Sequence, residues 1–225
     1  MNGASTARDL FARPTLEIAE RLLGWRLVRV DADGTARVGR IVELEAYIGE
    51  HDRASHARFG RTDRNRVMYG PPGRAYVYLV YGMHDCLNIV TEPEGSPAAL
   101  LVRAVDPLDG VAAMRDARER RLRTRSRRAG TAGPPAREPA PVHRLASGPG
   151  LVCAAFDLDR TLTGADLLDP GSPVHLEPPP PDEATPDVVR GPRVGVGYAG
   201  DRWATVPWRF AVAGDPSVSR PAVTR

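Results

Sequence analysis

One stretch of this sequence leaves few options apart from an antiparallel β-hairpin. The run from Ala75 to Tyr81 is rich in tyrosine and valine, which are enriched in β-strands. Gly82 and its neighbours follow with the composition of a turn, and Cys86–Thr91 supplies a second β-prone run. The sequence therefore predicts two paired strands with a tight tip at Gly82.

Other segments predict the elements around this hairpin. Apolar residues recur at helical spacing from Leu16 to Leu23, which predicts a helix that begins near Thr15 and stops at Gly24. Residues 170–192 contain eight prolines and are expected to be irregular. Further strands are expected at Arg26–Val30, Ile41–Ile48, Ala99–Val105, Val194–Gly197 and Trp208–Val212, and further helices at Leu108–Arg125 and Ser147–Ala155.

Length and composition limit the number of domains. With 225 residues, 42% of them hydrophobic, the chain can bury one substantial core. We expect a single α+β domain over residues 15–213, with a curved, mainly antiparallel sheet, surrounding helices and a protruding hairpin. A flexible loop is expected at 129–141, which is rich in Gly, Pro and Ala. Residues 1–14 are predicted to be a flexible lead-in and residues 214–225 a tail.

The sequence also gives an expectation about the compartment. No stretch approaches the ~20 apolar residues of a membrane span, and residues 1–9 have no apolar region of the kind that marks secretion. The two cysteines, Cys86 and Cys153, suit reduced thiols. We therefore expect a cytoplasmic protein.

Positive charge is concentrated in two stretches. All 31 basic side chains are arginine, and there is no lysine. Residues 115–128 hold eight arginines against Asp116 and Glu119, and residues 51–74 hold six against two aspartates. Such stretches suit a polyanion, because arginine forks onto phosphates and releases counterions. A solvated helix face followed by a flexible tail accounts for the first stretch equally well.

Aromatic and titratable residues cluster in one part of the chain. Five of the six tyrosines and three of the five histidines lie between residues 47 and 84. Because alternate side chains of a strand share a face, Glu43, Glu45 and Tyr47 point together, opposite a core face. An ordinary strand with one solvated face would give the same alternation, so the second tyrosine strand is what favours a site.

The tip of the predicted hairpin carries a further aromatic residue. Tyr76 and Tyr78 share one face of their strand, while Tyr81 points the other way at its end, beside Gly82. An aromatic tip next to arginine-rich segments suits a wedge between base steps of DNA. The alternative is that Tyr81 packs against its own sheet.

Several segments occur in an order that is specific to one family. They are Arg40–Tyr47, His56, Arg64–Tyr69, Pro72–Met83, Cys86–Ile89, Leu100–Ala104, Ser147–Gly150 and Arg193–Gly197. Over about residues 15 to 212, this ordered set resembles the alkyladenine (3-methyladenine) DNA glycosylase family. The resemblance implies an enzyme that binds double-stranded DNA containing damaged purines, such as 3-methyladenine and 7-methylguanine. It implies no organic cofactor and no metal.

The resemblance also implies a catalytic pair and a wedge. Glu45 matches the general base that activates the water attacking the sugar C1′, and Arg103 matches the arginine that helps hold this water. Tyr81 matches the residue that enters the minor groove in place of the extruded nucleotide, and Met83 lies beside it at the tip. A nearby Arg103 is expected to favour the ionised form of Glu45.

A base-binding pocket follows from the same comparison. Tyr47 and Tyr78 match the rings that sandwich the flipped base, and His56 matches a further wall that forms hydrogen bonds. Asn88 matches a residue that crowds the exocyclic amine of normal guanine. Val196 is placed near the water through its backbone carbonyl.

The absence of lysine indicates the type of reaction. Glycosylases that also cut the strand form a Schiff base with the sugar, which requires an amine. Here the only candidate amine is the N-terminus, in the predicted lead-in. We therefore expect a monofunctional enzyme that hydrolyses the N-glycosidic bond and leaves an abasic site. We also expect a monomer.

Two other classes remain as alternatives. A metal-dependent nuclease or phosphoesterase could use His51, Asp52 and His56 as ligands. A non-catalytic DNA-binding module would explain the basic helix equally well, but it would leave Glu45 without a role, because a buried carboxylate repels DNA.

Overall fold

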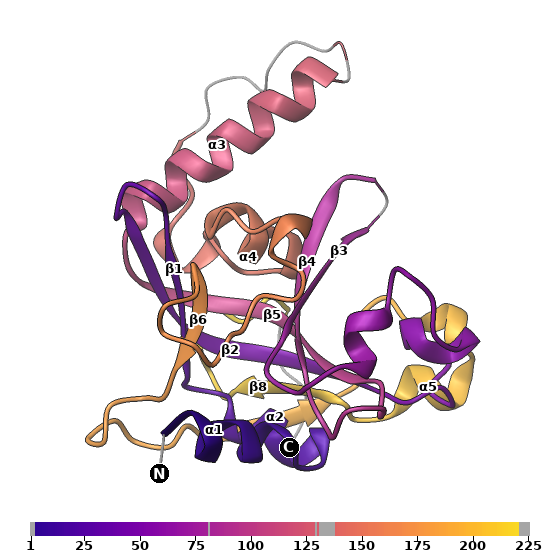
Figure 1. The fold of residues 1–225 in the computed structure, drawn as a ribbon. Coiled ribbons are helices and arrows are strands. Elements are labelled where there is room, and N and C mark those ends of the chain that lie inside the picture. Colours follow the sequence, from indigo (N-terminus) through magenta and orange to yellow (C-terminus); the bar gives the residue numbers. More distant parts are fainter. Residues whose placement is uncertain (1–2, 81, 129, 131–137, 221–225) are drawn as a thin grey trace.

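The computed structural model describes residues 3–80, 82–128, 130 and 138–220 (Figure 1). They form a single α+β domain, as the sequence predicts. The helices are α1 (Gly3–Phe11), α2 (Thr15–Arg21), α3 (Val111–Arg128), α4 (Pro149–Ala155) and α5 (Asp201–Thr205). The strands are β1 (Arg26–Val30), β2 (Ala36–Ile48), β3 (Ala75–Val80), β4 (His84–Val90), β5 (Ala98–Asp109), β6 (Val174–Glu177), β7 (Val188–Gly191) and β8 (Arg209–Val212).

One eight-stranded sheet organises these elements. Its main path runs β3-β4-β5-β2-β1-β6, and β8 pairs with both β2 and β7. All of the pairings between named strands in the described part of the chain are antiparallel, which confirms the expected sheet type. The register of β2 against β5 shifts between Ile41 and Leu44, at an irregularity of the kind that bends a strand.

The long strand β2 lies at the centre of this sheet. At Glu43–Glu45 it is flanked by β5 on one side and β8 on the other. Val42 and Leu44 lie in the core as expected, but Glu43 and Glu45 on the opposite face are also completely buried. The alternative of a strand with a solvated face is therefore wrong, because other elements cover both faces.

Helices pack around the sheet and close its core. In Figure 1, α1 and α2 lie below the central strands and α4 lies above them. Phe11 of α1, Ile18 of α2 and Phe156 after α4 belong to one large buried cluster with Leu44 and Val102 of the sheet. Among the described residues, no helix combines the length and apolar character that crossing a bilayer requires.

The predicted hairpin is formed by β3 and β4, from Ala75 to Val90. It extends away from the centre of the sheet, and α3 projects beside it (Figure 1). The two meet near the hairpin tip, where Arg125 Nη2 lies 3.4 Å from the sulfur of Met83. Tyr81, the predicted wedge, lies outside the described residues, as do 129 and 131–137 of the predicted flexible loop.

Two predictions from the C-terminal third of the chain are wrong. Residues 170–192 are not irregular throughout, because β6 pairs with β1 and β7 pairs with β8 on either side of the prolines. Val194–Gly197 is not a strand: Gly195 has a positive φ of 77°, and Gly197 begins a short 3-10 helix. The alternation of valine and glycine has the period of a strand, but the backbone of this segment is not extended.

The predicted terminal segments also carry structure. The supposed lead-in contains α1, whose Phe11 is completely buried and whose Arg8 pairs with Asp166 at 2.6 Å. At the other end, Ser217 is completely buried. The described parts of both segments therefore pack on the domain, through long-range contacts that local composition does not reveal.

Candidate functional site

Glu45 is a fully buried carboxylate held by two hydrogen-bond donors and one guanidinium. Val194 N donates to its Oε1 at 2.7 Å, and the Tyr47 hydroxyl donates to its Oε2 at 2.9 Å. The guanidinium of Arg103, on the neighbouring strand β5, lies 3.3 Å from Oε1. The structure thus brings together Glu45, Tyr47 and Arg103, three of the residues that the sequence analysis predicted for the site.

Arg103 bridges two carboxylates. Its Nε donates to Glu43 at 3.1 Å while its Nη1 faces Glu45, so both acidic side chains on this face of β2 share one cation. Burial lowers the pKa of Arg103, but the carboxylates of Glu45 and Glu43 raise it above its ordinary value overall. The arginine therefore stays charged and fixed between them.

The ionisation of Glu45 reflects two opposing effects. Burial raises its pKa, and this outweighs Arg103 and the donors Val194 N and Tyr47, which lower it. The expected influence of Arg103 has the right sign, but it does not set the net direction. A carboxyl group with a raised pKa that is still held by donors to its ionised form has the character of a general base.

The Tyr47 ring packs against an arginine from the loop after β7. The guanidinium carbon of Arg193 lies 4.7 Å from the centre of the Tyr47 ring. Arg193 itself forms a bidentate pair with Asp52, at 2.6 and 2.9 Å, and both side chains are completely buried. This pair anchors the loop whose next residue, Val194, donates to Glu45.

Three rings form a second part of the site. The His56 ring lies edge-on to Tyr78 with centroids 4.3 Å apart, and Tyr76 lies 5.4 Å from Tyr78. His56 Nδ1 and the Tyr76 hydroxyl are 3.0 Å apart. Burial raises the pKa of Tyr78, and the Glu45 carboxylate adds to the effect, so the Tyr78 ring lies in the neighbourhood of Glu45.

His56 is held neutral. Its pKa falls from 6.5 to about 4, first because the ring is buried and then because Arg64 and Arg58 lie nearby. Arg64 also lies over the Tyr78 ring, with its guanidinium carbon 5.6 Å from the ring centre. Near neutral pH the rings therefore add no positive charge to the site.

The structure also describes the other predicted residues except Tyr81. The Asn88 amide donates to the backbone carbonyls of Tyr76 at 3.1 Å and Cys86 at 3.3 Å. Val196 is buried, and its carbonyl accepts a hydrogen bond from Ala199 N. Met83 at the hairpin tip is 52% exposed.

The geometry argues against the ligand set of a metal-dependent nuclease. The Asp52 carboxylate is occupied by Arg193 and by backbone N–H groups, including that of Ala54. His51 packs near Trp203, with ring centroids 6.1 Å apart, while His56 faces the tyrosines. Within the described ranges, no group of three or more His, Cys, Asp or Glu side chains could hold a metal ion.

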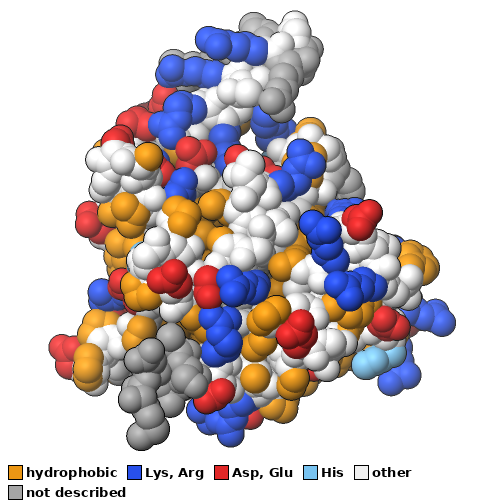
Figure 2. All heavy atoms as spheres, viewed as in Figure 1, with side chains coloured by type: hydrophobic (Ala, Val, Ile, Leu, Met, Phe, Trp, Pro, Cys, Tyr) orange, Lys and Arg blue, Asp and Glu red, His pale blue; other side chains and the backbone are white. Residues whose placement is uncertain are grey.

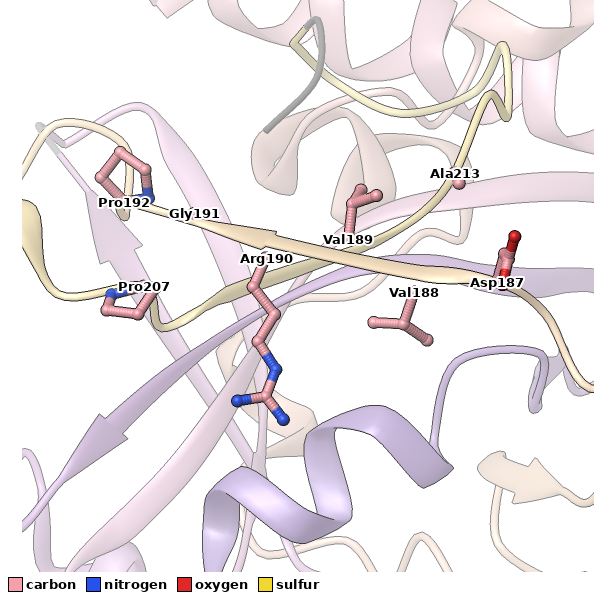
Figure 3. Close-up of a pocket in the computed structure, with 8 residues that line it drawn as sticks. All are labelled: Asp187, Val188, Val189, Arg190, Gly191, Pro192, Pro207 and Ala213. Atoms are coloured by element: carbon pink, nitrogen blue, oxygen red, sulfur yellow. The ribbon is translucent and has the colours of Figure 1, made fainter. Parts of the chain in front are cut away.

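A hollow of about 800 Å³ lies elsewhere, along β7 (Figure 3). It is lined by Asp187–Pro192, Pro207 and Ala213, and it includes none of the predicted site residues. Its Arg190 already pairs with Glu20 of α2 at 2.8 Å. The hollow is therefore separate from the cluster around Glu45.

Comparison with known proteins assigns the chain to a family. A family model described as methylpurine-DNA glycosylase matches residues 9–216. This chain belongs to the methylpurine-DNA glycosylase family. The match includes Glu45, Arg103 and all three rings of the His56 cluster.

Similar glycosylase relatives cover nearly the whole chain. Proteins of Methanocella arvoryzae, Anaeromyxobacter dehalogenans and Myxococcus xanthus each carry the name "Putative 3-methyladenine DNA glycosylase". The first is 47% identical over 96% of this chain and 96% of the relative. The others are 46% and 45% identical over 94% of this chain, and over 83% and 92% of the relatives.

Two features of this glycosylase were missed from the sequence. The Asp52–Arg193 pair joins residues 141 positions apart, and no local pattern signals it. The second feature is an exposed rim near His56, in which Arg58 lies 4.6 Å from the Phe59 ring centre and 5.4 Å from that of Tyr198. The high exposure of Phe59, 81%, is a signal that only the structure provides.

Proposed function

We propose that this member of the family releases alkylated purines from duplex DNA by hydrolysis of the N-glycosidic bond. The observation that carries the proposal is the buried Glu45 carboxylate, held by Val194 N, the Tyr47 hydroxyl and Arg103, with Tyr78 nearby and the His56 ring packed edge-on against Tyr78. The substrates are those that suit this chemistry, 3-methyladenine and 7-methylguanine, and the product is an abasic site.

Glu45 acts as the general base. Reaching a purine requires flipping the nucleotide out of the stack, at a cost of a few kcal/mol. With the base between Tyr47 and Tyr78, Glu45 takes a proton from the attacking water, and the same carboxylate stabilises positive charge developing on the sugar. Arg103 orients Glu45, and the Val196 carbonyl borders the water.

Neutral rings favour a positively charged base. Alkylation at N3 or N7 leaves the purine cationic, and a cation against a tyrosine face gains roughly 0.5–2 kcal/mol. His56, with its pKa of about 4, does not repel that cation near neutral pH. The Asn88 side chain crowds the exocyclic amine of normal guanine, which disfavours undamaged DNA.

The DNA backbone binds along α3 and the hairpin. Figure 2 shows arginine side chains gathered on projecting α3, and Arg125 reaches Met83 at the tip. Some arginines of this helix serve the fold instead: Arg121 pairs with Asp85 at 3.2 Å and with Asp157 at 3.4 Å. Phosphate contacts are therefore assigned to the outer part of α3, while Tyr81 and Met83 fill the space left by the flipped base.

The pH dependence of base release tests this function. Because burial raises the pKa of Glu45 above 4.5, its ionised form is complete only above that raised value and is lost as the pH falls through it. We expect the single-turnover release of 7-methylguanine from a methylated duplex, followed by chromatography, to fall about tenfold per pH unit below a midpoint above 4.5. A midpoint at or below 4.5 contradicts the role of Glu45, and no release at any pH contradicts the proposed function.

A further inference from the structure

A short segment near the C-terminus packs against the centre of the sheet. We call residues 215–219 the C-terminal strap. Asp215 pairs with Arg40 of β2 at 2.9 Å, and the buried Ser217 donates to Asp106 of β5 at 2.8 Å. The strap is therefore tied to the two strands that carry Glu45 and Arg103.

The last residue of the strap contacts the catalytic machinery itself. Ser219 N donates to Glu43 Oε2 at 2.7 Å, and Ser219 Oγ accepts from Arg103 Nη2 at 3.2 Å. Glu43 Oε1 accepts a hydrogen bond from Arg103 Nε and lies 3.5 Å from Arg209 Nη1. Ser219 thus contacts both partners of the buried Glu43–Arg103 pair.

We propose that the C-terminal strap positions Arg103 for catalysis, with Ser219 and Glu43 as positioning residues. The three nitrogens of the guanidinium face three different partners: Nε faces Glu43, Nη2 faces Ser219 and Nη1 faces Glu45. Because the guanidinium is planar, fixing two of its nitrogens fixes the direction of the third. The inference rests on the proposed function, and Ser219 lies beyond residues 9–216, where the family model matches.

The strap should therefore influence the ionisation of Glu45. Arg103 lowers the pKa of Glu45, and a guanidinium that is less well oriented would lower it less. The other groups that face Glu45 keep their contacts when Ser219 is replaced by alanine, which retains the backbone N–H that donates to Glu43. They are Glu43 and Tyr47 of β2, Val194 N, Tyr78 of β3 and Cys86 of β4.

Three substitutions at one position test the strap in the full-length protein. Ser219→Ala removes the contact to Arg103, and Ser219→Pro also removes the N–H that donates to Glu43. We expect single-turnover base release to fall about tenfold for S219A, the rate equivalent of one hydrogen bond to a charged group, and further for S219P. The acid midpoint should move to higher pH, and lesion binding should stay within about twofold of wild type. Ser219→Thr keeps the hydroxyl and should recover most of the loss.

A control substitution in the same segment accompanies these variants. Pro216→Ala changes an exposed side chain of the strap and should leave rate and midpoint unchanged. Wild-type rate and midpoint in S219A would overturn the proposal, and so would equal losses in S219A and S219T. If the wild-type protein releases no base, the proposed function fails, and the strap is judged by NMR titration of the Glu45 carboxyl. An unchanged Glu45 pKa in S219A then overturns it.

Discussion

Replacing Glu45 by glutamine is expected to lower the single-turnover rate of base release by about 10²–10⁴, the usual loss when a general base is removed. Glutamine keeps the shape of the side chain and can still accept the hydrogen bond from Val194 N. It cannot take a proton from water at neutral pH. Binding of the lesion duplex should therefore stay near the wild-type level while the chemical step is lost.

Two controls accompany this substitution: the thermal stability of Glu45→Gln, and the same replacement at Glu50, an exposed carboxylate. Because burial raises the pKa of Glu45, its ionised form opposes folding at pH values above that raised pKa, and a neutral side chain avoids this cost. The thermal midpoint of Glu45→Gln at pH 7 should not lie far below that of wild type. Glu50 also accepts a tyrosine hydroxyl, that of Tyr69 at 2.7 Å, but it is exposed, so Glu50→Gln should keep the wild-type rate. Near-normal release by Glu45→Gln would show that another group activates the water.

The Asp52–Arg193 pair gives the largest expected effect on stability. Asp52→Ala leaves the Arg193 guanidinium completely buried without its carboxylate partner. Breaking a buried pair in this way costs about 3–5 kcal/mol of unfolding free energy. The hydrogen bonds from Arg193 to the carbonyls of Ala46 and Trp203 remain, but they do not neutralise the charge.

An exposed pair of the same chemistry provides the comparison. Arg190 and Glu20 are 2.8 Å apart with half-exposed side chains, so Glu20→Ala should cost at most about 1 kcal/mol. Urea unfolding of both variants and of wild type gives the two differences directly. A loss of less than about 1 kcal/mol in Asp52→Ala would mean that the loop carrying Val194 is not held by this pair.

Much of the fold could be predicted from local patterns. The hairpin of β3 and β4, the helix at Thr15 and the strand Arg26–Val30 all follow from periodicity and turn residues that act over a few positions. β6 and β7 could not be predicted, because prolines dominate the segment around them and their strand character depends on partners in β1 and β8. The alternation at Val194–Gly197 misled for the opposite reason, since it lacks a partner strand.

The candidate site was predictable where it is encoded locally. Glu43 and Glu45 share a face because strands alternate, and the family resemblance placed Glu45 and Arg103 together before the structure did. The donor Val194 N and the strap residue Ser219 were not predictable, because each reaches β2 across a separation of more than a hundred residues. In addition, a hydrogen bond donated by a backbone N–H does not depend on the residue type, so the sequence does not indicate it.

Borohydride trapping tests most directly the central claim that water, and not an amine of the protein, displaces the base. The wild-type protein is incubated with a duplex containing 7-methylguanine and borohydride, and the products are separated under denaturing conditions with and without alkali. Because the chain has no lysine, we expect released base, no covalent protein–DNA adduct, and a strand that breaks only after alkali. A trapped adduct, or a strand that is nicked without alkali, would contradict the water mechanism.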